Sequence, residues 1–102
     1  NNTAIGNGAM SQNTSGLENT AVGSSPLLSN TTGSYNTAVG RFAMRLNTTA
    51  SENTAVGWNA LYANTTGTPN TAIGYNSQAA NTTGAANASL GSALSTIRAE
   101  RE

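Results

Sequence analysis

The chain has 102 residues, no net charge and only 8% charged residues, and it contains no Lys, Asp, His or Cys. The lack of a basic patch argues against nucleic-acid binding, and the lack of His, Cys and Asp removes the usual ligands of zinc and calcium sites. We therefore expect no nucleic-acid partner, no metal and no cofactor. No apolar run approaches the roughly 20 residues that span a bilayer, so we expect no membrane insertion by this segment.

A five-residue unit, Asn-Thr-Ala-Ile/Val-Gly, recurs with a fixed spacing of 17 residues. Its copies begin at residues 2, 19, 36, 53 and 70, and a decayed copy, Asn-Ala-Ser-Leu-Gly, begins at residue 87. A fixed period without insertions is typical of repeat architectures. We therefore expect residues 1–91 to form a stack in which each repeat is one rung. Positions within a rung are counted below from its first Asn.

The first five positions of each rung predict a short strand followed by a corner. Thr at position 2 and a branched apolar residue at position 4 alternate around a small Ala, which is typical of a strand with one packed face. Gly at position 5 allows a tight corner. The predicted core ladder is Ile5, Val22, Val39, Val56, Ile73 and Leu90, and the predicted corner glycines are Gly6, Gly23, Gly40, Gly57, Gly74 and Gly91.

Positions 6 to 11 leave two structures open. They are rich in Ala, Leu and Met and lack β-branched residues in all five full repeats, which favours a short helical turn. A narrow, two-sided roll would instead need a second short strand there. Positions 12 to 15, mostly Asn-Thr-Thr-Gly, carry the chemistry of a turn.

Together these patterns predict a mostly β protein, a parallel β-solenoid or β-roll with 17-residue rungs. Each rung has few large apolar side chains, so it must bury them against its neighbours or against other chains. We therefore expect the chain to associate with itself, as a homotrimer or a filament. The repeated Asn at positions 1 and 12 predicts stacked amide ladders along the rungs.

Residues 92–102 abandon the repeat for charged, helix-forming residues. This segment is either a polar cap that ends the stack or the beginning of a helical stalk.

The repeat resembles two groups of bacterial and viral surface proteins. The Asn-Thr-Ala-Ile/Val-Gly unit is similar to the repeats in the heads of trimeric autotransporter adhesins, which form left-handed parallel β-rolls. With Ala60-Leu61 and the turn at residues 64–67, it resembles still more closely the repeat arrays of bacterial and phage tail-fibre-like proteins. The resemblance covers residues 2–91. The period is longer than the adhesin's, and Thr replaces Val at position 2. It implies a trimeric fibre, extracellular, on a cell surface or on a virion, that spaces or presents a binding surface.

Catalysis has little support in the sequence. A Ser nucleophile would need a base, and the chain has neither His nor Lys. Glu18 and Glu52 are the only carboxylates of the repeats, and two rungs would separate them by about 10 Å. We interpret them as solvated turn residues and expect no enzyme activity.

Three kinds of surface site remain as hypotheses. Trp58 and Tyr75 share position 6 on neighbouring rungs, near Tyr62 and Phe42; they form either an outward platform for a cell-surface glycan or a packed contact between protomers. The sequons that begin at Asn13, Asn30, Asn47, Asn64 and Asn81 are either glycosylation sites or only turn residues. The regular Thr columns suggest ice binding, although adjacent Thr residues in a strand would point to opposite faces.

Overall fold

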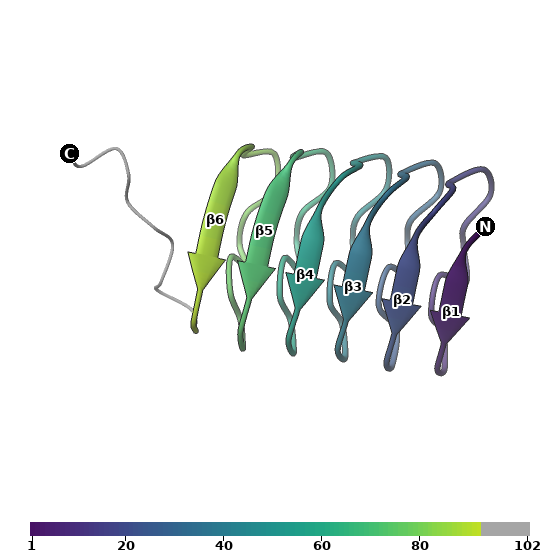
Figure 1. Ribbon diagram of the computed structural model, residues 1–102, viewed down its shortest axis with the longest axis horizontal. Helices are drawn as coiled ribbons and strands as arrows, with labels where there is room; N and C mark the ends of the chain where they lie inside the picture. Colours follow the sequence, from purple (N-terminus) through teal and green to yellow (C-terminus); the bar gives the residue numbers. More distant parts are fainter. Residues whose placement is uncertain (93–102) are drawn as a thin grey trace.

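The computed structural model describes residues 1–92, which form one parallel sheet of six short strands (Figure 1). Each strand pairs in register with the strand of the next repeat; Thr37, for example, lies opposite Thr54. One 17-residue repeat is therefore one turn of a β-solenoid, and the predicted parallel solenoid is confirmed. The predicted cap or stalk lies, except for residue 92, outside the described residues. The strands are β1 (Thr3–Ile5), β2 (Thr20–Val22), β3 (Thr37–Val39), β4 (Thr54–Val56), β5 (Asn70–Ile73) and β6 (Asn87–Leu90).

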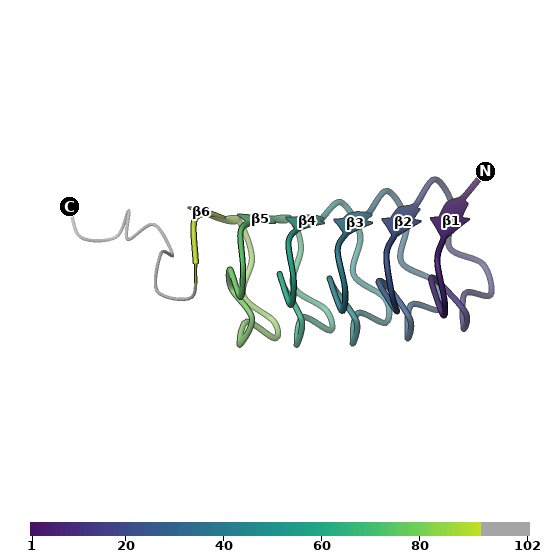
Figure 2. The ribbon, with the colours of Figure 1, turned by 90° about the horizontal axis from the view of Figure 1, so that it is seen from below.

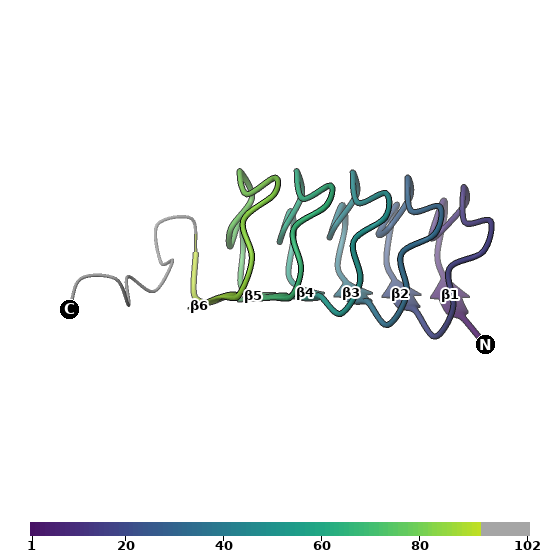
Figure 3. The same cartoon turned by 90° about the horizontal axis from the view of Figure 1, so that it is seen from above.

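The strands line one side of the solenoid, and the return segments lie on the other. Figures 2 and 3 show the return segments of the rungs on one side of the sheet, whereas the links that lead into β2, β3 and β4 arch out on the other side. In Figure 1 the strands run downward in front, the return segments run upward behind, and successive rungs advance from right to left. The coil is therefore left-handed. Within residues 1–92, the outer face of the strands themselves is not covered by backbone.

The return segment is a series of tight turns, so the helical turn and the second strand that the sequence left open are both wrong. The amide of Ala60 donates to the carbonyl oxygen of Gly57 at 3.2 Å, and the amide of Tyr62 donates to that of Asn59 at 3.1 Å. Asn59 and Leu61 have positive φ values of 61° and 51°. Bonds to the third residue back with a positive φ inside the turn are features of type II turns.

These turns leave alternate amides free to bond between rungs. The amide of Leu61 donates to the carbonyl oxygen of Ser77 on the next rung at 2.9 Å, and the amide of Asn59 donates to that of Arg41 on the previous rung at 3.0 Å. A helix would use these amides within the rung. The stack is therefore held by hydrogen bonds on its turn side as well as in its sheet.

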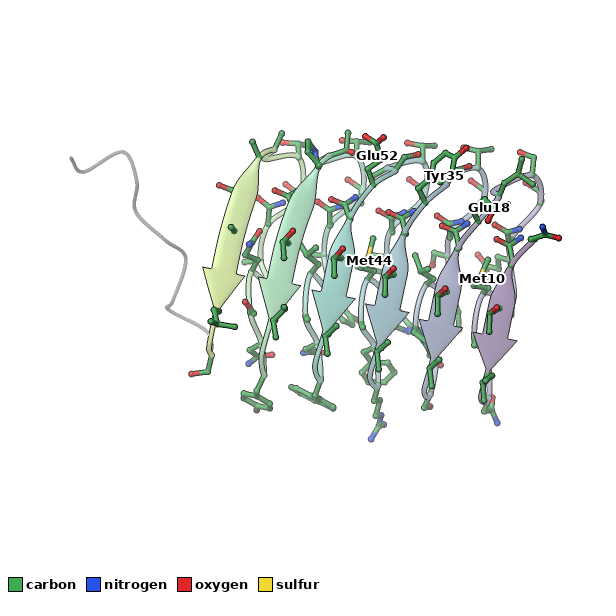
Figure 4. The ribbon with its side chains drawn as sticks, in the orientation of Figure 1. Met10, Glu18, Tyr35, Met44 and Glu52 are labelled. Carbon is green, nitrogen blue, oxygen red and sulfur yellow. The ribbon has the colours of Figure 1, made fainter. Side chains whose placement is uncertain are left out.

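The interior of the coil is filled by alanines and by larger side chains that are not branched at Cβ. Position 3 is fully buried at Ala21, Ala38, Ala55 and Ala72, and position 9 is fully buried at Leu27, Met44 and Leu61. Figure 4 shows Met10 and Met44 behind the strands, inside the coil. Each central rung thus has a core made chiefly of one alanine from the strand, one Leu or Met from the turns and the buried Pro or Ala of position 8.

The prediction that position 4 forms the core ladder is wrong. Its side chains lie on the outer face of the sheet: Ile5 is 60% exposed, Ile73 38% and Leu90 73%, and Val22, Val39 and Val56 are half-buried. Successive side chains of a strand point to opposite faces. Because the narrow interior admits only Ala beside the position 9 side chain, the branched residue next to it faces outward.

The corner glycines are confirmed. Their φ values lie between 121° and 134°, a region that side chains with a Cβ rarely enter. A Cβ built on Gly57 would lie 2.6 Å from the carbonyl oxygen of Gly74 on the next rung. Glycine therefore permits both the corner and the close stacking of neighbouring corners.

The core becomes polar in the fifth rung. Gln78 replaces the Leu or Met of position 9, and its Nε2 donates to the carbonyl oxygen of Thr71 at 2.9 Å and to Oγ of Ser89 at 3.0 Å. Ser77 and Ser89 hydrogen-bond to each other beside it. The apolar column thus ends at Leu61, one rung before the last complete repeat.

Two adjacent substitutions in β4 test which face of the strand points into the core. Ala55→Val adds two methyl groups to a filled interior, so we expect it to lower the free energy of unfolding by roughly 1–3 kcal/mol. Val56→Ala shortens a side chain on the outer face, and we expect a loss below about 1 kcal/mol. Urea denaturation at one low protein concentration measures both. A larger loss for Val56→Ala than for Ala55→Val would place Val56 in the core and contradict the structure.

Candidate functional site

Two columns of buried asparagines connect the rungs. The first is position 1, where Oδ1 of Asn53 accepts the main-chain amide of Asn70 on the next rung at 2.7 Å. Its Nδ2 donates to the carbonyl oxygen of Gly67 in its own rung at 3.0 Å. The ladder at position 1 therefore runs through the main chain rather than from amide to amide.

The second column, at position 12, is an amide ladder of the kind predicted from the sequence. Nδ2 of Asn47 donates to Oδ1 of Asn30 at 2.8 Å, and Nδ2 of Asn64 donates to Oδ1 of Asn47 at 3.1 Å. The Nδ2 of Asn64 also donates to the carbonyl oxygen of Gly67 at 3.0 Å. Both asparagine columns thus meet at the carbonyl oxygen of position 15.

This geometry removes the three central sequons as glycosylation sites in the folded chain. Asn30, Asn47 and Asn64 are fully buried, and the Nδ2 atom that would carry a glycan is hydrogen-bonded in each. Asn13 and Asn81, in the first and fifth rungs, are partly exposed but use Nδ2 in the same way. The glycosylation hypothesis is therefore wrong for the three central residues, because a glycan there would break the ladder.

Position 15 contains one irregularity, Ala50. In the fourth rung the three amides of residues 65–67 all donate to the carbonyl oxygen of Thr82, at 2.9 to 3.3 Å. The corresponding amides of the third rung belong to residues 48–50. Only the amide of Thr48 donates to the carbonyl oxygen of Thr65 on the next rung, at 3.4 Å. A methyl group at position 15 crowds the ladder, since a Cβ on Gly67 would lie 2.6 Å from Oδ1 of Asn64. The contact between the third and fourth rungs is therefore weaker than its neighbours.

The outer face of the sheet carries two parallel columns and no charge. One column is the aliphatic position 4 described above. The other is position 2, formed by Thr3, Thr20, Thr37, Thr54 and Thr71 and continued by Ala88. We call these two columns together the outer sheet face.

The threonines of the turns have two different environments. At position 13 the hydroxyl is bonded to the next rung; Oγ1 of Thr48 donates to the carbonyl oxygen of Thr65 at 3.4 Å. At position 14 the side chains are exposed, at Ser15, Thr32, Thr49, Thr66 and Thr83. Adjacent threonines therefore do not form a double column on one surface, whereas the threonines of position 2 stand beside an aliphatic column on the sheet.

The predicted aromatic platform exists in part. Trp58 and Tyr75 stack with ring centroids 4.9 Å apart and an angle of 12° between the planes, and they are 38% and 58% exposed. Tyr62 does not join them, because it packs edge-on against Phe42 with centroids 6.0 Å apart. The exposed pair lies just after the corner glycines, at the ends of β4 and β5.

Two arginines that the sequence analysis did not assign to a site gather around Phe42, in the rung before Trp58. The Cζ atoms of Arg41 and Arg45 lie 4.6 and 5.5 Å from the ring centroid of Phe42. Arg41 occupies position 6, directly before Trp58 in the same column. That shared position was the sequence signal for Arg41, whereas Arg45 is at position 10. We call Arg41, Arg45, Trp58 and Tyr75 the corner cluster.

The carboxylates lie elsewhere. Glu18 and Glu52 follow one another along the upper edge of the sheet with Tyr35 between them (Figure 4). In residues 1–92, no group of His, Cys, Asp or Glu side chains could hold a metal ion. The same residues contain no helix long and apolar enough to cross a bilayer.

No family model, curated protein or solved structure matches this chain. Its function is therefore argued from its own geometry and from the resemblance of its repeat.

The asparagine ladder can be tested with Asn47→Asp. The substitution replaces Nδ2, which donates to two oxygens, with a carboxylate oxygen that faces the same two acceptors. Burial and these acceptors should raise the pKa of the new carboxyl above its unfolded value of about 3.9. The folded state then binds more protons, so stability falls as the pH rises from about 4 through the folded pKa.

We expect Asn47→Asp to lose at least about 3 kcal/mol at pH 7 and to recover part of that loss near pH 3, measured by chemical denaturation at both pH values. Thr66→Asp, on the exposed position 14, is the control and should change stability by less than about 0.5 kcal/mol at pH 7. Equal losses in the two variants would mean that the ladder does not hold the stack.

Proposed function

We propose that this chain is a rigid structural segment of a fibre, in which copies of the chain associate side by side through the outer sheet face. The observation that carries the proposal is the aliphatic column at position 4. It stands on the surface of a single chain, although the interior is so thin that further burial would stabilise each rung. Covering this column with other copies removes apolar area from water.

The outer sheet face is suited to contact with itself. Copies related by a symmetry axis parallel to the stack would bring equal rungs to the same height, so aliphatic residues meet aliphatic residues. Neither position 2 nor position 4 carries a charge in residues 1–92, so no like charges meet. Three copies around such an axis would enclose their aliphatic columns, which gives the homotrimer expected from the resemblance.

The size of this face favours long arrays. Strands about 4.8 Å apart and about 10 Å long offer roughly 50 Å² per rung, or about 300 Å² for six strands. A stable interface buries about 800 Å² per partner. Association through this face would therefore strengthen with each added repeat, as a fibre requires. An extracellular, cell-surface or virion location is supported by the resemblance to adhesin and tail-fibre arrays.

The outer sheet face also favours a second candidate, ice binding. A flat, uncharged surface with a column of threonine hydroxyls beside a column of methyl groups, repeated at about 4.8 Å, can order water in a regular array. This candidate requires the face to stay open to solvent, so it predicts a monomer. The oligomeric state therefore separates the two candidates.

The test compares the chain with a longer array, made by repeating residues 2–86 once before residues 87–102. We expect light scattering to give about three times the single-chain mass for the longer array, and weaker, concentration-dependent association for the original chain. Replacing Val22, Val39 and Val56 with Thr in every copy keeps size and strand propensity but makes the face polar. This variant should remain folded by circular dichroism and lose the association.

A control variant replaces the exposed Thr32, Thr49 and Thr66 with Ser in every copy. Its mass should match that of the unmodified array. A longer array that stays monomeric at every accessible concentration would contradict the proposed association. If that monomer also depressed the freezing point below its melting point, ice binding would replace the fibre as the proposed function.

A further inference from the structure

We propose that the corner cluster is a binding site for an acidic saccharide, in which Arg41 and Arg45 bind the carboxylate of a sugar residue and Trp58 and Tyr75 contact its rings. The proposal goes beyond the structural role above, because it assigns a ligand to a surface that the fibre contact does not use.

The site is a short row of unlike side chains at one corner of the coil. Arg41, Trp58 and Tyr75 occupy position 6 on three successive rungs, each directly after a corner glycine. The main chain connects them: the amide of Asn59 donates to the carbonyl oxygen of Arg41, and that of Asn76 to the carbonyl oxygen of Trp58, at 3.0 and 2.8 Å. The spacing of the row is therefore fixed by the solenoid at about 4.8 Å per side chain.

Among the residues that the structure describes, the cationic end of the row has no partner of opposite charge. Both guanidinium groups lie against the ring of Phe42, and Nε of Arg45 is buried without a hydrogen-bond acceptor. The two glutamates of the repeats lie along the opposite, upper edge of the sheet, whereas position 6 follows the lower ends of the strands (Figures 1 and 4). Within residues 1–92 these two arginines are thus an unpaired pair of positive charges held by one aromatic ring.

The chemistry of the row selects the ligand class. A guanidinium group binds a carboxylate through two parallel hydrogen bonds, and it is always charged. Exposed Trp and Tyr rings offer apolar surface with a polar edge, which suits the alternating C–H and hydroxyl groups of a sugar. A single carboxylate matches two arginines, while a nucleic-acid backbone would need many more cations. An oligosaccharide with uronic-acid-type residues has a carboxylate for the arginines and sugar rings for Trp58 and Tyr75.

The corner cluster and the outer sheet face are separate surfaces. The face consists of positions 2 and 4 on the strands, and position 6 lies past the corner glycine, where the chain has turned away from the sheet. Copies joined through the face would therefore leave the cluster accessible at its margin. A fibre would then present one such site per chain at a fixed height.

The chain contains a single tryptophan, so the fluorescence of Trp58 reports on this site directly. We expect a tetramer of galacturonate to change its emission in a saturable way that weakens as salt is added, since the attraction is partly electrostatic. The neutral galactose tetramer should bind about tenfold more weakly or worse. Arg41→Gln and Arg45→Gln should each weaken binding of the acidic tetramer by about tenfold, with an unchanged circular dichroism spectrum.

Glu52→Gln is the matched control, because it removes a charge from the opposite edge; it should leave the affinity unchanged. Equal binding of the acidic and neutral tetramers would overturn the role of the arginines, and no response to either would overturn the site. A blue shift of Trp58 emission when the longer array associates would also overturn it, because the ring would then be buried between copies. Light scattering on the same samples reports the association separately, so the fibre and the saccharide site can fail independently.

Discussion

The carbonyl oxygen of position 15 receives two side-chain amides in every complete rung, and much of the solenoid depends on this junction. One amide comes from the asparagine that begins the rung and the other from the asparagine of the turn, as Asn53 and Asn64 do at Gly67. Each of these asparagines also bonds to a neighbouring rung. Since buried amides are costly unless they are bonded, this arrangement fixes the 17-residue register as strictly as the sheet does.

A stack held largely by hydrogen bonds can have a very narrow interior. In the fourth rung Ala55, Ala60 and Leu61 are fully buried, and the β-branched Val56 lies on the outer face. The Val and Ile of each strand are consequently displaced to the outside. The same narrowness therefore explains the glycine corners, the alanine in the strands and the aliphatic column available for association. The narrow interior also accounts for the corner cluster. Side chains too large for the interior, such as Trp58, lie outside it at the corners.

Much of the fold could be predicted from the sequence because it depends on spacing. The period, the parallel register, the corner glycines and the asparagine ladder at position 12 all follow from residues that recur every 17 positions. The direction in which each strand faces could not be predicted in this way, since Thr54 and Val56 look like a packed face when the width of the coil is unknown. The turns at Asn59 and Leu61 could not be predicted either, because a positive φ is common for Asn but rare for Leu, and the sequence therefore carried no signal for the second turn. The pairing of Arg41 and Arg45 on Phe42 depends on that turn geometry.

The most direct test of the account is hydrogen exchange of the side-chain amides of Asn30, Asn47 and Asn64, followed by nuclear magnetic resonance. Exposed side-chain amides exchange rapidly, whereas bonded groups in a cooperative core exchange only when the stack opens. If the two asparagine columns hold the rungs together, these three Nδ2 groups will exchange as slowly as the main-chain amides of β3 and β4. Exchange at the rate of a free asparagine, in a chain whose sheet amides remain protected, would contradict the central role of the ladder.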